Sequence, residues 1–177
     1  VRLVGSEMCI RDRIECFDFG KYPGPHVTPE LMLDLSEKIN TKLKSDKFHG
    51  VIVTHGTDTL EETAYFLDLT IKTEIPIVVI GAMKNSSEPD WDGPKNLIDA
   101  LHICLNDNSK NLGVLVCLNG EINAASEVTK IYSDSVESFK SLDFGTLGFV
   151  QNGRVIFNRL PRHLETIETD KINTNVD

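Results

Sequence analysis

The sequence is short of positive charge, and this shortage argues against one class of function. It holds 18 lysine and arginine residues against 27 aspartate and glutamate residues, which gives a net charge of −9 over 177 residues. A protein that binds nucleic acid by neutralising phosphates needs a basic surface. We therefore expect no nucleic-acid partner, and the composition fits chemistry on a small molecule better.

The sequence also lacks a long hydrophobic run and any C-x-x-C pair. Its longest apolar stretch, from Ile75 to Ala82, contains Pro76 and is far shorter than the roughly 20 residues that cross a bilayer. Two of the four cysteines lie in apolar segments, which is typical of reduced, buried thiols. We expect a soluble cytoplasmic protein with no membrane partner and no disulfides. The cysteines are Cys9, Cys16, Cys104 and Cys117.

The two ends of the sequence look different from the rest. Residues 1–13 have no leading methionine, no apolar core of a signal peptide and no helix or strand period. They resemble translated sequencing-adapter DNA, so we expect the natural sequence to start near Ile14. Residues 163–177 hold isolated apolar residues among polar ones, and we interpret them as the start of a linker. The length alone predicts one domain.

Between these ends, apolar strands alternate with helical patterns. Leu31, Leu35, Ile39 and Leu43 recur every four residues, which predicts a helix from Pro29 to about Lys44 with Thr28 as its N-cap. The alternation indicates β-α-β units with right-handed crossovers. The expected strands are Ile14–Phe19, Gly50–Thr54, Pro76–Ile80 and Gly113–Leu118. A second helix is expected to open at Thr59 and to carry Leu60, Ala64, Leu67 and Ile71. A third is expected to open at Asp92, with an apolar side of Leu97, Leu101, Cys104 and Leu105.

The pattern changes after Gly120 to shorter segments. We expect short stretches at Glu121–Ala125 and Val128–Tyr132, a short helix near Val136–Lys140 and a hairpin of Thr146–Val150 with Arg154–Phe157. The predicted fold class is α/β: a three-layer, flavodoxin-like or Rossmann-like arrangement around a mostly parallel sheet, with a C-terminal β-hairpin.

Ligands of open α/β sheets bind beyond the carboxyl ends of the strands, and polar residues follow the predicted strand that ends at Thr54. Gly56 allows a sharp turn there, and Thr57 and Asp58 come to the start of a helix, where free N–H groups favour an anion. These two residues can carry chemistry or merely cap the helix. His55 has no second histidine or cysteine at ligand spacing, so we expect it to stabilise the turn and expect no metal.

The string from Gly50 to Leu60, G-V-I-V-T-H-G-T-D-T-L, resembles a signature of the bacterial-type L-asparaginase family over eleven residues. Further similarity lies in Glu61–Thr70, Gly81–Met83, Asp92–Leu97, Val128–Lys130, Phe139–Ser141 and Gly145–Gly153. The resemblance implies that residues 14–162 are an asparaginase N-terminal domain. This family hydrolyses the side-chain amide of asparagine, and often glutamine, through a threonine acyl-enzyme and without a cofactor.

The resemblance also implies roles for single residues. Thr57 matches a catalytic threonine, Lys130 the lysine that accepts its proton, and Asp58 a carboxylate that also holds the substrate α-amino group. Gly56 and the backbone carbonyl of Ala82 fall at substrate-binding positions. A Thr-Lys-Asp relay requires these three groups in one place, because a hydrogen bond reaches only about 3 Å. We assign Glu61 and Glu62 no catalysis, since both suit the first turn of a helix.

Two departures from the family pattern accompany these assignments. The family's T-G-G-T-I string, which supplies its primary nucleophile and ends its first strand, is not in this sequence. Gly24 takes the place of a substrate-binding serine, which leaves only its backbone to contact a substrate carboxylate. We accordingly expect residues 14–162 to be an incomplete domain without its first strand, and the 177-residue chain by itself to be inactive.

Two other readings of the sequence stay open. One is the asparaginase-like subunit of a glutamyl-tRNA amidotransferase, which would favour a basic tail that a chain of charge −9 does not offer. The other is a non-catalytic domain that binds a small molecule, which the absence of turnover would support. If the asparaginase reading holds, the resemblance implies an amino-acid amide as substrate and a homodimer or homotetramer.

Overall fold

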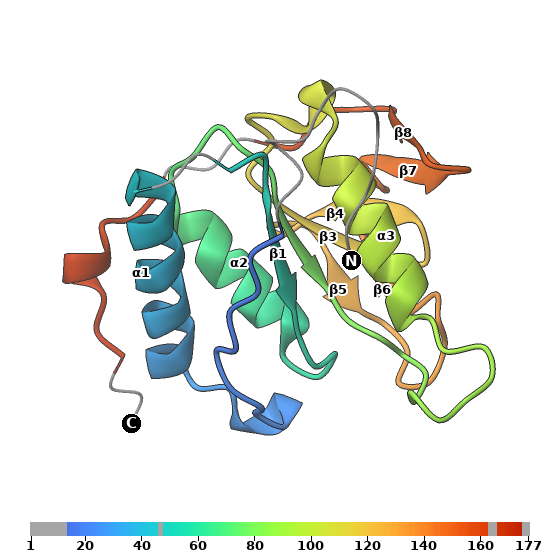
Figure 1. Ribbon diagram of the computed structural model, residues 1–177, viewed down its shortest axis with the longest axis horizontal. Coiled ribbons are helices and arrows are strands. Elements are labelled where there is room, and N and C mark those ends of the chain that lie inside the picture. The colour runs from blue at the N-terminus through green and yellow to red at the C-terminus, as the bar shows by residue number, and fades with distance from the viewer. Residues whose placement is uncertain (1–13, 46–47, 163–165, 175–177) are drawn as a thin grey trace.

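The computed structural model describes residues 14–45, 48–162 and 166–174, and it arranges them as a mixed sheet between helices (Figure 1). The segment 1–13 and parts of the predicted linker 163–177 lie outside the described residues. In chain order the elements are η1 (Gly24–His26), α1 (Pro29–Ser45), β1 (Val51–Thr54), α2 (Leu60–Thr70), β2 (Ile77–Ile80), α3 (Gly93–Cys104), η2 (Asp107–Ser109), β3 (Val114–Leu118), β4 (Glu121–Ala124), β5 (Thr129–Lys130), β6 (Phe139–Lys140), β7 (Gly148–Gln151), β8 (Arg154–Phe157) and η3 (Thr169–Lys171).

Three short apolar strands form the parallel part of the sheet. Strand β1 pairs with β2 and β2 with β3, both in parallel, and α2 and α3 make the two crossovers. The sheet then continues through antiparallel pairs in the order β1-β2-β3-β4-β7-β8, while β5 and β6 form a separate two-stranded sheet. The predicted α/β class is confirmed, and its parallel pairing is confined to the first three strands.

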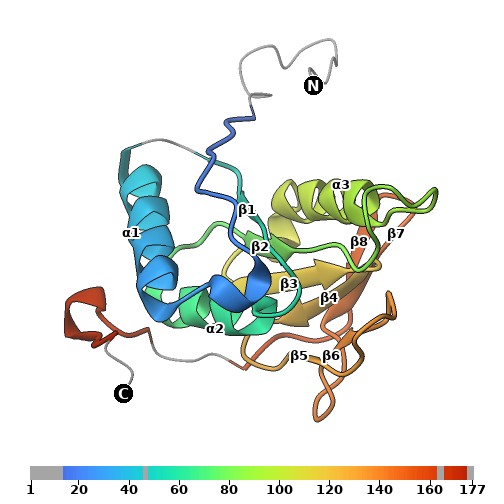
Figure 2. The same ribbon diagram turned by 90° about the horizontal axis from the view of Figure 1, so that it is seen from below.

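Helices cover both faces of the parallel part of the sheet, so β2 and β3 are buried from two sides (Figure 2). Val79 and Val116 point to the side of α1 and α2, where they meet Ile39 and Leu67. Their strand neighbours point to the other side, where Val78 and Leu115 pack against Ala100 and Ile103 of α3. This alternation explains why the strands read as unbroken apolar runs in the sequence.

Helix α1 buries the face that the sequence predicted, whereas the buried face of α3 differs from its predicted face. Ile39 is buried and Leu35 and Leu43 pack against the same cluster, as the four-residue spacing predicts. In α3 the predicted apolar face is wrong for two of its four members: Cys104 is buried as predicted, but Leu97 and Leu105 are 41% and 65% exposed. Two polar residues, Asn96 and Asp99, are buried instead.

Two further predicted elements are wrong. Ile14–Phe19 is not a strand: its residues have no strand pairing, and the edge strand β1 pairs only with β2 in the described residues. Its Phe17 ring instead lies 4.4 Å from the Lys42 ammonium of α1. Val136–Lys140 is not a helix, since Ser135 and Ser138 close a turn with side-chain hydrogen bonds and the chain then enters β6.

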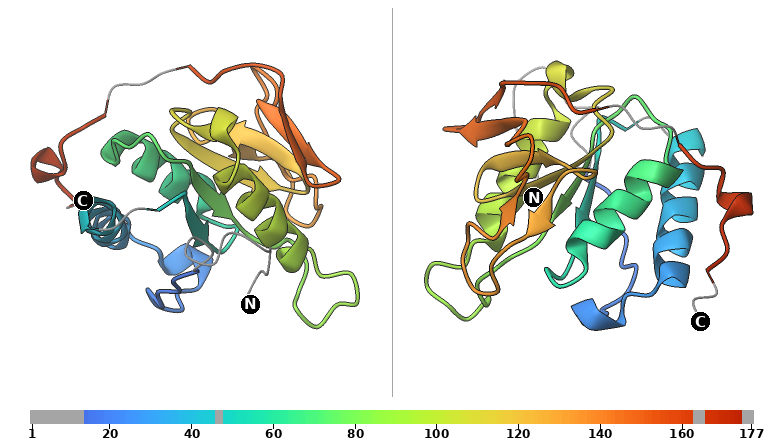
Figure 3. Two further views of the ribbon diagram at one scale, coloured as in Figure 1. Left: turned by 45° about the horizontal axis from the view of Figure 1, so that its top comes forward. Right: turned by 180° about the vertical axis from the view of Figure 1, so that it is seen from behind.

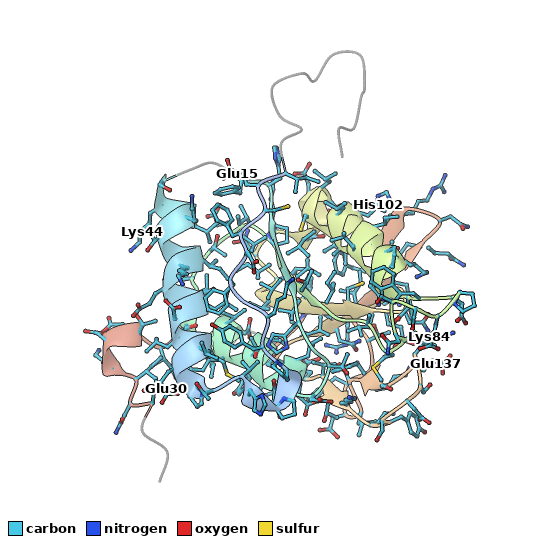
Figure 4. All side chains as sticks on the ribbon, turned by 60° about the horizontal axis from the view of Figure 1, so that its bottom comes forward. Glu15, Glu30, Lys44, Lys84, His102 and Glu137 are labelled. Carbon is cyan, nitrogen blue, oxygen red and sulfur yellow. The ribbon has the colours of Figure 1, made fainter. Side chains whose placement is uncertain are left out.

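The predicted hairpin is present as β7 and β8, at the end of the sheet away from α1 (Figure 3). Its two-residue turn has Asn152 and Gly153 at φ 50° and 74°, the left-handed region that primed turns require. A Cβ atom on Gly153 would lie 3.2 Å from the ring of His102, which α3 presents here (Figure 4). The turn and α3 therefore approach closely at a position that suits glycine.

The described cysteines are unpaired, and they differ sharply in burial. Cys16 is exposed, whereas Cys104 and Cys117 are buried. Burial raises the pKa of Cys104 to about 12 and also raises the pKa of the Cys117 thiol. In the described part of the chain, no helix is both long enough and apolar enough to cross a bilayer.

These burials predict selective alkylation. At mildly alkaline pH, iodoacetamide should modify Cys16 at least about tenfold faster than Cys104 or Cys117, because only an accessible thiolate reacts. Peptide mass spectrometry of the labelled protein measures the three sites separately. Unfolding in guanidinium chloride should make the rates similar, and equal rates in the native protein would contradict the burial.

Candidate active site

The carboxyl ends of β1 and β2 bring two loops together at one edge of the sheet. Residues 55–59 follow β1, and residues 81–92 follow β2, which runs parallel to it (Figure 1). The two loops touch: a Cβ atom on Gly81 would lie 2.9 Å from Cγ2 of Thr57 and 3.0 Å from the carbonyl oxygen of His55. Only a residue without a side chain fits at this close approach.

Thr57, Asp58 and Lys130 meet at this edge. The Lys130 Nζ atom lies 3.0 Å from Thr57 Oγ1 and 3.3 Å from Asp58 Oδ1, although the lysine is 73 residues away from the threonine in the chain. The lysine side chain is 19% exposed and the aspartate 58% exposed. A lysine at this distance can exchange a proton with the threonine hydroxyl, and the half-exposed carboxylate keeps acceptor capacity for a ligand.

Gly24 joins the site from a distant part of the chain. Its carbonyl oxygen accepts a hydrogen bond of 2.8 Å from Thr59 Oγ1, and a Cβ atom on Gly24 would lie 2.9 Å from the Cβ of Asp58. Gly56 is close as well, because a Cβ atom there would lie 3.4 Å from the Cα of Gly24. Thr59 occupies the N-cap position of α2, where we expected the helix to open, but its hydroxyl bonds Gly24 and makes no capping bond.

The loop that carries Ala82 is fixed by two residues at the start of α3. Asp92 accepts hydrogen bonds from the backbone N–H groups of Met83 and Lys84, each at 3.0 Å. The fully buried Asn96 donates to the carbonyl of Gly81 and accepts from the backbone N–H of Asn119 after β3. Asn96 thus joins the loops after β2 and β3, and Ala82 follows Gly81 as a half-buried residue.

His55 lies in the turn between β1 and the site. Its Nδ1 atom is 2.7 Å from the carbonyl oxygen of Gly56, and its Nε2 atom is 3.0 Å from the hydroxyl of the buried Thr63. The carbonyl can only accept, so the Nδ1 atom carries a proton and Nε2 faces the hydroxyl. The histidine ties the turn to α2. Within residues 14–45, 48–162 and 166–174, no three His, Cys, Asp or Glu side chains form a metal-binding group.

Glu61 contacts the site in a way that the sequence did not indicate. Its carboxylate accepts a hydrogen bond of 3.0 Å from Thr129 Oγ1 and another from the backbone N–H of Lys130. The adjacent Glu62 is exposed. The expectation that both glutamates serve only the first turn of a helix is therefore incomplete for Glu61. Its partners lie 68 and 69 residues further along the chain, and no local pattern could have predicted the contact.

Comparisons with known proteins all point to the same protein family. Residues 7–163 match the family model described as "Asparaginase, N-terminal". The chain is 44% identical over 140 residues to the "Probable L-asparaginase periplasmic" of Haemophilus influenzae, an alignment that covers 79% of the chain and 40% of that relative. It is also 44% identical over 137 residues to "L-asparaginase 2" of Escherichia coli, with 77% and 39% covered. The chain thus spans less than half the length of these two relatives.

A solved structure is similar as well. The crystal structure of a "Probable Cytoplasmic L-asparaginase from Campylobacter jejuni" has a TM-score of 0.82 and 39% sequence identity. The similarity covers 87% of this chain and 50% of that one.

The buried amide of Asn96 leads to a prediction about stability. Asn96→Ala should lower the free energy of unfolding by about 2–4 kcal/mol, because the carbonyl of Gly81 and the N–H of Asn119 lose their partner. Urea denaturation of the natural gene product that contains this chain measures the change. Asn108→Ala, at an exposed position of η2, should change it by less than about 0.5 kcal/mol. Equal effects of the two substitutions would contradict the assigned role of Asn96.

Proposed function

Because the chain belongs to the asparaginase family, we propose that this protein hydrolyses the side-chain amide of L-asparagine to L-aspartate and ammonia. One observation carries the proposal: Lys130 Nζ lies within hydrogen-bond distance of both Thr57 Oγ1 and Asp58 Oδ1. A threonine hydroxyl is almost wholly protonated at neutral pH, so it needs a base to become a nucleophile. Lys130 is placed to take up a proton through Thr57, so that the two together can serve as that base.

In the proposed mechanism, amide hydrolysis proceeds through an acyl-enzyme. A threonine hydroxyl attacks the amide carbon, the C–N bond breaks, and the nitrogen leaves as ammonia after taking up a proton. Water then attacks the ester, which releases aspartate and restores the hydroxyl. Following the family resemblance, the acyl group forms on a threonine of the family's T-G-G-T-I string, which the 177 residues given do not include, and Thr57 and Lys130 relay the proton. Asp58 holds Lys130 in place through their ion pair.

Substrate contacts follow from the groups around this relay. The exposed carboxylate of Asp58 is suited to the positively charged α-amino group of asparagine. Gly24 lies against the Asp58 side chain and Gly56 lies against Gly24, so backbone without side chains adjoins this carboxylate, and we propose that its N–H groups contact the carboxylate of the substrate. The backbone carbonyl of Ala82 is proposed to face the amide that is cleaved. These contacts would bind a small zwitterion with a side-chain amide.

We also propose a homodimer or homotetramer that works without a cofactor. Phe149 and Ile156 lie opposite each other on β7 and β8, and both remain exposed, at 39% and 46%. Such adjacent apolar side chains favour contact with a further subunit. We place the protein in the cytoplasm, because the structurally similar Campylobacter jejuni protein is named a probable cytoplasmic L-asparaginase and the unpaired thiols support a reducing compartment.

Removal of either end of the relay tests the function. In the natural gene product that contains this chain, Thr57→Ala or Lys130→Met should lower kcat for asparagine by at least about a thousandfold, because proton transfer loses its donor or acceptor. Ammonia release measures turnover, and circular dichroism checks the fold. Lys38→Met, at an exposed lysine of α1, should keep full activity. Wild-type turnover in Thr57→Ala or Lys130→Met would refute the assignment.

The close approach at Gly24 gives a second test. Gly24→Ala places a methyl group against the side chain of Asp58, so it should raise KM for asparagine by about tenfold or more through weaker contact with the α-amino group. Gly145 provides the control, since it has φ 71° and open space around it. Gly145→Ala should cost about 1 kcal/mol of stability and leave KM unchanged. Equal KM values in both variants and the wild type would argue against a substrate contact at Gly24.

A further inference from the structure

We infer that Glu61 is a positioning residue for Lys130, an inference that rests on the proposed function. Glu61 acts on the backbone from which the lysine side chain starts, and not on the ammonium at its end. Its two carboxylate oxygens accept from the Thr129 hydroxyl and from the Lys130 N–H. The structure thus assigns a role to one glutamate of the pair Glu61 and Glu62, and not to the other.

The direction of the β5 hydrogen bonds explains why this carboxylate is needed. N–H groups alternate between the two edges of a strand. Ile131 donates to the carbonyl of Ser138 on the β6 side at 2.7 Å, so the N–H of Lys130 points to the opposite edge. In the described residues β5 pairs with β6 alone. The carboxylate of Glu61 fills the place that a second neighbouring strand would occupy.

Residues 57–61 therefore hold both the backbone and the ammonium group of Lys130. Glu61 binds the lysine backbone, while Thr57 and Asp58, four and three residues before it, bind the ammonium. The lysine side chain is long and flexible, and β5 has only two residues. Fixing its backbone against the turn that carries Thr57 sets the distance between Nζ and Oγ1. Loss of this hold should slow proton transfer more than it weakens substrate binding.

Kinetics of the natural gene product that contains this chain test the inference. Glu61→Ala should lower kcat for asparagine by about tenfold or more and change KM by less than about threefold, because the relay and not the substrate contact is displaced. Glu62→Ala removes the same charge from the same helical turn, and it should change kcat by less than about twofold. A Glu61→Ala kcat within twofold of wild type, or equal losses in both variants, would overturn the inference.

A conservative variant separates hydrogen bonding from charge. Gln at this position can accept from the Lys130 N–H and donate to the Thr129 hydroxyl, so Glu61→Gln should retain at least about a third of the wild-type kcat. A Glu61→Gln variant as slow as Glu61→Ala would overturn the hydrogen-bonding role. If Glu61→Ala does not fold, Thr129→Val removes one of the two bonds and should lower kcat by about threefold; an unchanged kcat would count against the inference.

A spectroscopic measurement keeps this inference distinct from the proposed function. In protein labelled with ¹⁵N-lysine, the Lys130 amide proton should move upfield by more than about 0.5 ppm in Glu61→Ala and by less than about 0.1 ppm in Glu62→Ala, because a charge-assisted hydrogen bond deshields it. The shift does not depend on turnover. If Glu61→Ala shifts the Lys130 amide proton but the wild-type protein releases no ammonia, the proposed function alone is refuted. If the amide proton has the same chemical shift in Glu61→Ala and in the wild type, the role of Glu61 is refuted.

Discussion

Parallel pairing of β1, β2 and β3 constrains the rest of the molecule. Each return to the same end of the sheet requires a crossover, and α2 and α3 supply the two crossovers on opposite faces. The strands are then covered from both sides and tolerate few polar side chains. Polar residues that could do chemistry are thereby confined to the loops beyond the strand ends. The turn of Thr57 and Asp58 and the loop of Ala82 lie in these positions, next to each other.

The loops at that edge depend on hydrogen bonds from polar side chains at the starts of helices. Asn96 and Asp92 stand where α3 begins, and their hydrogen bonds fix the backbone after β2 and β3. Lys130 reaches the same edge from the small β5–β6 sheet, and Glu61 holds it there. The candidate site thus combines loops of the main sheet with one residue from outside it. Correct geometry requires that both parts be held against α2.

The sequence predicted the parts of this arrangement that depend on local patterns. The apolar runs of β1 to β3 and the four-residue spacing of α1 were sufficient for the fold class, and Thr57 and Asp58 could be found because they follow a buried strand. Lys130 became a candidate only through the family resemblance, since nothing in its neighbourhood distinguishes it. Long-range contacts explain the misses: Asn96 turns a polar face of α3 inward, and the partners of Glu61 lie 68 and 69 residues away.

The separate β5–β6 sheet has a consequence for how heat would affect this protein. Its two strands share only two residue pairs, and side chains such as Phe139 join it to the core, whereas β2 and β3 of the main sheet are longer, fully buried strands paired on both sides. Small units with few contacts open at a lower free energy than the core does. Local opening of β5 would remove Lys130 from Thr57 while the main sheet stays folded. Under the proposed function, we therefore expect activity to be lost on heating before the main sheet melts.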